Sequence, residues 1–111
     1  MLWRVNFPRM NNSRLLGMMG LAAKAGKLAA GTEAVTEKIK SGKGVLLVLI
    51  ASDVSQNTLK KIVNCCEYYR TEYLQLQFTQ DEISDAVGKS YLTSSVAILD
   101  RNFANAIKKL V

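Results

Sequence analysis

Val45-Leu46-Leu47-Val48-Leu49-Ile50, continued by Ala51, is the longest apolar stretch of the chain, and it decides the fold. It shows no alternation of apolar and polar residues, and it is far too short to span a membrane. A strand with one face in water would alternate, so this one is expected to be covered on both faces. We therefore predict a central strand with helices on both sides of its sheet.

Other segments complete the sheet. Ser95–Leu99 is a second buried strand, whereas Leu74–Phe78 alternates and is expected nearer an edge. Leu28–Ala30 is a short strand at most. Strands and helices that alternate along the chain predict an α/β fold, here a three-layer α/β/α sandwich with a mixed, four-stranded central sheet.

Helices are expected between these strands, each with its own start signal. The first helix begins at Asn12 or Ser13 and ends near Ala25, and the second begins at Gly31 or Thr32 and ends near Ser41. The third begins at Asp53 or Ser55 and ends near Tyr69. Thr79 or Gln80 caps a short helix over Asp81–Val87, and Asp100 begins the last helix. In the second helix we expect Ala34, Val35, Ile39 and the stem of Lys38 to face inward.

The chain is expected to form a single domain over residues 12–111, preceded by a tail or extension over residues 1–11. Two interpretations of the tail stay open. In the first, Met10 is the true start of the protein and residues 1–9 are an upstream extension. In the second, Trp3 and Phe7 cover part of the core. The N-terminus has no apolar signal core, so we expect a cytoplasmic protein without membrane contact.

The charge of the chain is distributed unevenly. The net charge is +6. Residues 1–43 contain eight Lys or Arg and two Glu, whereas residues 44–111 contain seven residues of each sign. Such an asymmetry favours a polyanionic partner, most often nucleic acid, although many small proteins without such a partner are equally basic.

The residue types that most catalytic or metal sites need are missing or poorly placed. The chain has no histidine, the commonest general base and metal ligand. Cys65 and Cys66 are adjacent, which suits neither a disulfide nor a metal site, and Cys66 is expected to fill the core. Gly26–Thr32 has the glycine spacing of a phosphate-binding loop but lacks its lysine. We expect no enzyme, no cofactor and no metal.

Tyr68 and Tyr69 stand at the end of the third expected helix. Aromatic side chains in this position could stack on nucleic-acid bases. More often, aromatic residues at a helix end pack on the core.

The segment Ala25–Lys43 is basic and bracketed by glycines, and we interpret it as the working surface. A recognisable pattern runs through it and continues beyond it: Gly26-Lys27-Leu28, Gly31-Thr32-Glu33-Ala34-Val35, Ile39-Lys40-Ser41-Gly42-Lys43, Val45–Ala51, Ser52-Asp53, Asn57-Thr58, Lys60-Lys61, Cys66-Glu67-Tyr68-Tyr69, Gly88-Lys89, Val96–Asp100 and Phe103-Ala104. Over about residues 13–110 the chain resembles the ribosomal L-seven-Ae and L-thirty-e superfamily, most closely the small bacterial branch called YlxQ.

The resemblance implies the same α/β/α sandwich and the binding of a kinked, structured RNA, a kink-turn or kink-loop. In this family RNA is gripped by the turn and helix that correspond to Gly31–Lys38, and a loop that corresponds to Lys89–Thr93 covers a base that leaves the stack. The candidate RNA-binding residues are Lys27, Gly31, Thr32, Glu33, Thr36, Lys38, Lys89, Ser90, Tyr91, Leu92 and Thr93.

The chain also departs from the family motif Gly-x-Asn-Glu-Val-Thr-Lys. It has Glu33, Ala34 and Glu37 where the motif has Asn, Glu and Lys. Two hypotheses therefore stay open. The first is a non-catalytic, ribosome- or translation-associated monomer that binds kink-turn-like RNA, with ribosomal RNA and the ribosome as candidate partners. The alternative is a protein-interaction module on the same fold, with RNA binding weakened or lost.

Overall fold

The computed structural model describes residues 12–42 and 44–110, so the expected tail over residues 1–11 lies outside the described residues. No helix in the described ranges is long and apolar enough to cross a membrane. The elements follow the predicted order: α1 (Asn12–Lys24), β1 (Leu28–Ala30), α2 (Thr32–Lys40), β2 (Leu47–Ile50), α3 (Gln56–Tyr68), β3 (Tyr73–Gln75), α4 (Gln80–Val87), β4 (Ser95–Ile98) and α5 (Arg101–Leu110).

The four strands form one mixed sheet in the order β1-β4-β2-β3. Strand β4 is antiparallel to both β1 and β2, and β2 is parallel to β3. In this register Leu49 of β2 lies between Val96 of β4 and Leu74 of β3. The apolar stretch therefore occupies the centre of the sheet, and β3 lies at an edge, as predicted.

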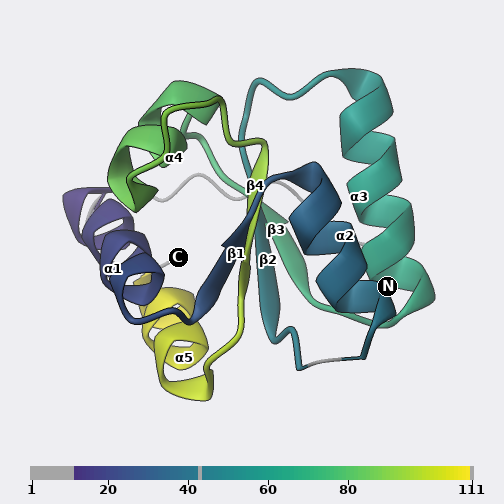
Figure 1. Cartoon of the computed structure of the whole chain (residues 1–111), viewed down its shortest axis with the longest axis horizontal. Coiled ribbons are helices and arrows are strands. Elements are labelled where there is room, and N and C mark those ends of the chain that lie inside the picture. Colours follow the sequence, from purple (N-terminus) through teal and green to yellow (C-terminus); the bar gives the residue numbers. More distant parts are fainter. Residues whose placement is uncertain (1–11, 43, 111) are drawn as a thin grey trace.

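Helices cover both faces of the sheet (Figure 1). Helices α1, α4 and α5 lie on one face, and α2 and α3 on the other. Leu47 and Leu49 belong to the first core, whereas Val48 and Ile50 belong to the second. Successive side chains of a strand point to opposite faces, so β2 needs apolar residues at every position. The predicted three-layer sandwich is confirmed.

Strand β3 is shorter than predicted and begins one residue earlier. It spans Tyr73–Gln75 instead of residues 74–78. The alternation of apolar and polar residues over residues 74–78 still predicts which side chains are buried, because Leu76 and Phe78 are buried. The Leu76 N–H donates to the Ile50 carbonyl at 2.8 Å. Strand β2 ends at Ile50, so the chain beyond Leu76 has no strand to continue the ladder.

The two cysteines fill the core between the sheet and the α2–α3 layer. Burial, with smaller contributions from the nearby Cys65 and Glu67, raises the pKa of the Cys66 thiol to about 12. The thiol therefore stays protonated near neutral pH and is a poor nucleophile. In the described part of the chain no group of three or more His, Cys, Asp or Glu could hold a metal ion.

Cys66 should react with Ellman's reagent far more slowly in the native protein than in urea. The reagent needs a thiolate, and burial both blocks access and holds the pKa near 12, above the usual 9.0. Because the unfolded thiol ionises near pH 9.0 and the native thiol only near 12, this group leaves the free energy of unfolding constant below about pH 9 and lowers it as the pH rises from there to about 12. Measurement at pH 8 on single Cys65→Ser and Cys66→Ser proteins separates the two thiols. Rapid native labelling of Cys66 would contradict this picture.

Helices α1 and α4 approach each other closely at Gly20. A Cβ at this position would lie 2.8 Å from the carbonyl oxygen of Ala86, a distance that real Cβ contacts do not reach. Gly17, one turn earlier on α1, is exposed and has no atom within 4 Å of its would-be Cβ. The two glycines therefore predict opposite effects of the same substitution.

Gly20→Ala should lower the free energy of unfolding by about 1–3 kcal/mol, because the helices must separate to admit the methyl group. Gly17→Ala should raise it by about 0.5–1 kcal/mol, since alanine loses less backbone entropy in a helix. Urea unfolding followed by circular dichroism measures both. Equal effects of the two substitutions would disprove the close approach at Gly20.

Candidate functional site

Three helix N-termini meet at the edge of the sheet that is formed by the carboxyl ends of β1, β2 and β3 (Figure 1). Strands β1 and β2 both run antiparallel to β4, and β3 runs parallel to β2, so β1, β2 and β3 all end at the same edge. Helices α2, α3 and α4 follow these strands in the chain. In open α/β sheets, ligands bind outside the carboxyl ends of the strands.

An open groove of about 580 Å³ lies at this edge. It is formed by the starts of α2, α3 and α4 and by the loop between α4 and β4. The lining residues are Ala30, Gly31, Thr32, Glu33, Ala34, Val54, Ser55, Thr58, Gln80, Tyr91, Leu92 and Ser94. We take this groove as the candidate functional site.

Gly31 turns the chain from β1 into α2. Its φ of 100° and ψ of 153° belong to a region that is essentially restricted to glycine. Its N–H donates to the Ser95 carbonyl at 2.8 Å, which ties the turn to β4. A side chain at this position would meet no neighbouring atom within 4 Å, but its backbone would be strained.

The N-terminus of α2 is the only one of the three in the groove without a side-chain cap. Ser55 caps α3 and Thr79 caps α4 through their hydroxyl oxygens, whereas the N-cap of α2 is Gly31. The first N–H groups of a helix have no acceptor within the helix. They also lie at the positive end of the helix dipole. The start of α2 can therefore donate to an anionic or polar ligand.

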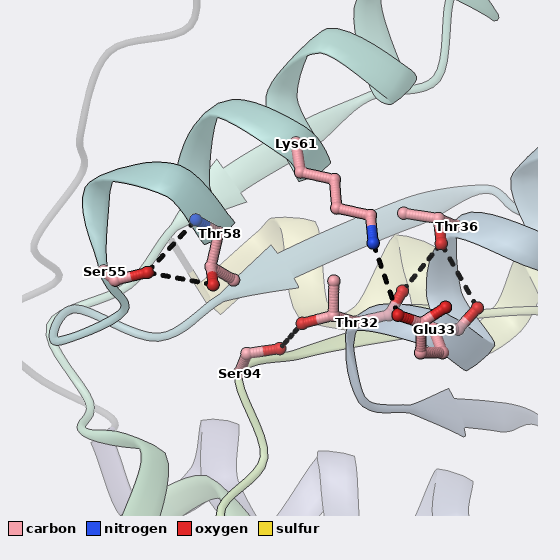
Figure 2. A network of polar contacts seen from close by, with 7 residues as sticks. All are labelled: Thr32, Glu33, Thr36, Ser55, Thr58, Lys61 and Ser94. Carbon is pink, nitrogen blue, oxygen red and sulfur yellow. Dashed lines mark hydrogen bonds and ion pairs between the residues drawn. The ribbon is translucent and has the colours of Figure 1, made fainter.

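Hydroxyl groups hold the loop over residues 89–93 against the helices. Thr32 Oγ1 and Ser94 Oγ share a hydrogen bond of 2.6 Å, which joins α2 to the end of the loop (Figure 2). Ser84 Oγ of α4 donates to the Tyr91 carbonyl at 2.5 Å and shares a hydrogen bond of 2.9 Å with Thr93 Oγ1. These bonds leave the side chain of Leu92 exposed at the rim of the groove.

Glu33 is the charged residue among those that line the groove. Its carboxylate lies 3.3 Å from Lys61 Nζ, and this ion pair joins α2 to α3 (Figure 2). Both side chains are largely exposed, so the pair is worth less than about 1 kcal/mol. No Lys or Arg among the described residues lines the groove. The groove therefore offers a ligand the N–H groups at the start of α2 and hydroxyl groups, and any contact of the ligand with a described cation lies outside it.

The structure brings together some of the sequence-predicted residues and separates others. Gly31, Thr32, Glu33, Tyr91 and Leu92 all line the groove. They come from segments that are about sixty residues apart in the chain, as the 62-residue separation of Thr32 and Ser94 illustrates. This is the grouping that the family resemblance implies.

The predicted lysines lie outside the groove. Lys27 stands before β1, and its carbonyl accepts from Leu99 at the opposite edge of the sheet from the groove. Lys38 is exposed in the last turn of α2. Lys89 and Ser90 are exposed, and Lys89 lines a second groove of about 530 Å³ beside α1 and α4. Any role for these residues therefore requires a ligand that extends beyond the groove.

Thr36 and Thr93 are buried, and a role in direct surface contact does not fit their positions. Thr36 is 3% exposed, and its hydroxyl donates to the carbonyls of Thr32 at 2.8 Å and Glu33 at 3.2 Å (Figure 2). Thr93 is held by Ser84. Both residues support the groove from within.

The expected inner face of α2 needs a related correction. Ala34 and Lys38 are exposed, and Thr36 is buried with Val35 and Ile39. A threonine can be buried in a helix when its hydroxyl bonds back to a carbonyl of the preceding turn, as it does here.

Ser55, Thr58, Gln80 and Ser94 also line the groove, although they were not among the predicted site residues. The sequence indicates Ser55 and Gln80 only as possible helix starts. The signal that would have found them is topological: helices that follow strands of the same direction start at the same edge of the sheet. Ser94 lies at that edge because β4 starts where its antiparallel neighbours end.

The chain resembles proteins that are named for RNA binding. It is 34% identical to the RNA-binding protein YlxQ of Enterococcus faecium over 101 residues, which cover 91% of this chain and 94% of that protein. It is 32% identical to the RNA-binding protein YlxQ of Bacillus subtilis (strain 168) over 94 residues, which cover 85% of this chain and 91% of that protein.

Solved structures share the fold. A protein of unknown function from Bacillus halodurans C superposes with a TM-score of 0.79 and 27% identity, over 89% of this chain and 97% of that one. The Giardia lamblia 15.5kD RNA binding protein superposes with a TM-score of 0.73 and 18% identity, over 96% of this chain and 89% of that one. At 18% identity the second likeness shows the fold alone.

A family model spans most of the chain. Residues 13–108 match the model of the ribosomal protein L7Ae/L30e/S12e/Gadd45 family. This range includes the groove, the loop over residues 89–93 and every element of the sheet. The chain belongs to the ribosomal protein L7Ae/L30e/S12e/Gadd45 family.

Proposed function

We propose that the chain is a non-catalytic RNA-binding protein that recognises a sharply kinked, structured RNA, a kink-turn or kink-loop. The observation that carries the proposal is the meeting of the uncapped start of α2 with the loop over residues 89–93 in one groove. Family membership and relatives that are named RNA-binding proteins support it.

The geometry suits recognition of shape. RNA duplexes hide their base edges in a deep, narrow major groove, so proteins select bends and unpaired bases. The N–H groups at the start of α2 can bind oxygens of the RNA. Gly31, which has no side chain, lets the RNA backbone approach closely. Tyr91 and Leu92, exposed at the rim, can cover a base that leaves the stack.

No catalytic step is part of the proposal. The chain has no histidine, and its two thiols are buried in the core. We place the protein in the cytoplasm, on ribosomal RNA or another RNA of the translation machinery. The family and the net charge of +6 support this assignment.

One observation favours a second function, a protein-interaction module. The charged residue that lines the groove is the acidic Glu33, and neighbouring Ala34 cannot hydrogen-bond to a base through its side chain. A groove of this kind could also receive a polar segment of a protein. Crosslinking in the native cell distinguishes the two: recovery of a shared bent RNA favours the first function, and a protein partner that survives nuclease treatment, without crosslinked RNA, favours the second.

The protein should bind kink-turn RNA more tightly than a straight duplex of the same length and composition. A gel-shift assay measures both. If about three to five phosphates are contacted, log Kd should change with log salt concentration with a slope of a few units. Equal affinity for the two RNAs would rule out recognition of shape, and a flat salt response would rule out the phosphate contacts.

Leu92→Ala should weaken binding of the kinked RNA about fivefold without a change in stability. The substitution removes apolar surface that we expect to cover a base, worth roughly 1 kcal/mol. Leu21→Ala on α1 is the matched control, since Leu21 is 56% exposed and Leu92 59%. Equal affinities of the two variants would exclude Leu92 from the RNA interface.

A further inference from the structure

Tyr68 and Tyr69 form an exposed aromatic pair at the end of α3. Tyr68 is 80% exposed and Tyr69 43% exposed, so the interpretation that these residues pack on the core is wrong for Tyr68. Their ring centroids lie 4.8 Å apart with an interplanar angle of 72°. Two large rings held against each other at the surface provide faces for stacking.

The pair lies at the opposite end of the α2–α3 layer from the groove (Figure 1). Glu33 in the first turn of α2 pairs with Lys61 in the first half of α3, and one turn farther along both helices the Thr36 carbonyl accepts from Cys65 Sγ at 3.9 Å. The helices therefore run side by side in the same direction, and their C-terminal ends lie together. At about 1.5 Å per residue, the 13 residues of α3 separate the rings from the groove by roughly 20 Å.

Cations from both helices gather at this end. Lys40 is exposed in the last turn of α2. Burial raises the pKa of the Cys65 thiol of α3 and the charge of Lys40 partly opposes this rise, so Lys40 lies within electrostatic reach of α3. Arg70 is exposed directly after the two tyrosines. The nearby acid Glu67 is engaged with the fold, since its carboxylate accepts from the Tyr73 hydroxyl at 2.7 Å.

Arg70 has a backbone conformation that favours glycine. Its φ is 57°, and it is the one non-glycine residue with positive φ in the described part of the chain. It closes α3, with the Thr71 N–H donating to the Cys66 carbonyl at 2.8 Å. Glycine is the usual residue at this position of a helix end. An arginine in a left-handed conformation is strained, which suggests a function for its side chain.

We propose that Lys40, Tyr68, Tyr69 and Arg70, here called the tyrosine patch, bind unpaired nucleotides that extend from the kinked RNA. This inference rests on the proposed function of the groove. Bases stack on aromatic rings with little dependence on sequence, and cations beside the rings meet the phosphates. The patch would therefore select RNAs whose kinked element has a single-stranded extension, in addition to the shape read by the groove.

The test compares two RNAs with the same kinked element, one blunt and one with an unpaired, adenine-rich tail of about ten nucleotides. Tails are placed on the 5′ and the 3′ end in turn. The native protein should bind one of the tailed RNAs about tenfold more tightly than the blunt RNA. Tyr68→Ala should abolish this difference and leave the affinity for blunt RNA unchanged. Tyr68→Phe, which keeps the ring, should retain it.

Arg70→Gly provides a readout that a purely structural role would not give. It should raise Tm by about a few degrees, because glycine relieves the left-handed strain, and it should weaken binding of the tailed RNA. Lys24→Ala on α1, in the helix layer on the other face of the sheet, removes an exposed cation and should leave the effect of the tail intact.

The outcomes separate the patch from the groove. If the native protein binds neither the blunt nor the tailed kinked RNA better than a straight duplex, the proposed function of the groove fails. If it prefers the kinked element but gains nothing from either tail, the groove stands and the tyrosine patch is overturned as an RNA contact, which leaves a protein as the candidate partner for the exposed rings. A tail effect that survives Tyr68→Ala also overturns the proposal.

Discussion

The antiparallel placement of β4 between β1 and β2 is the constraint on which the site depends. Because β4 runs against its neighbours, the strands before α2 and α3 end where β4 begins. The first residue of β4 and the residue before it then hold the start of α2: the Ser95 carbonyl accepts from the Gly31 N–H, and Ser94 shares a hydrogen bond with Thr32. The same strand is buried along its whole length. The core and the start of α2 at the groove therefore depend on the same strand.

The glycine N-cap of α2 lowers the stability of the helix only slightly and leaves the first N–H groups of the helix open to a ligand. Glycine at an N-cap stabilises a helix less than serine by only about a few tenths of a kcal/mol. Ser55 and Thr79 cap the neighbouring helices of the groove with their own side chains, and those N-termini are thereby engaged within the protein. At Gly31 the absence of a side chain leaves the helix N-terminus accessible. A serine there would both strain the backbone and occupy the donors that a ligand needs.

The sequence predicted the fold more fully than the site, and the reason is physical. A strand that is buried on both faces needs apolar residues at every position, so the uninterrupted apolar run Val45–Ile50 indicated a central strand without further information. Site residues depend on where distant segments meet. Lys27 and Gly31 flank the same short strand, yet the strand places them at opposite edges of the sheet. The burial of Thr36 depends on hydrogen bonds to carbonyls of its own helix, and a threonine on a helix gives no sign of this in sequence.

The position of the positive charge also limits how RNA can bind. The described cations of the N-terminal two-fifths lie along α1, before β1 and at the end of α2, and none of them lines the groove. Charges at the surface are screened over about 8 Å at physiological salt, whereas the molecule measures 31 × 28 × 26 Å. An RNA confined to the groove would therefore gain little from the net charge of +6. For the charge to contribute to affinity, the RNA must extend over the protein, and the end of α2, with Lys38 and Lys40, is the cationic surface that lies on the same helix as the groove.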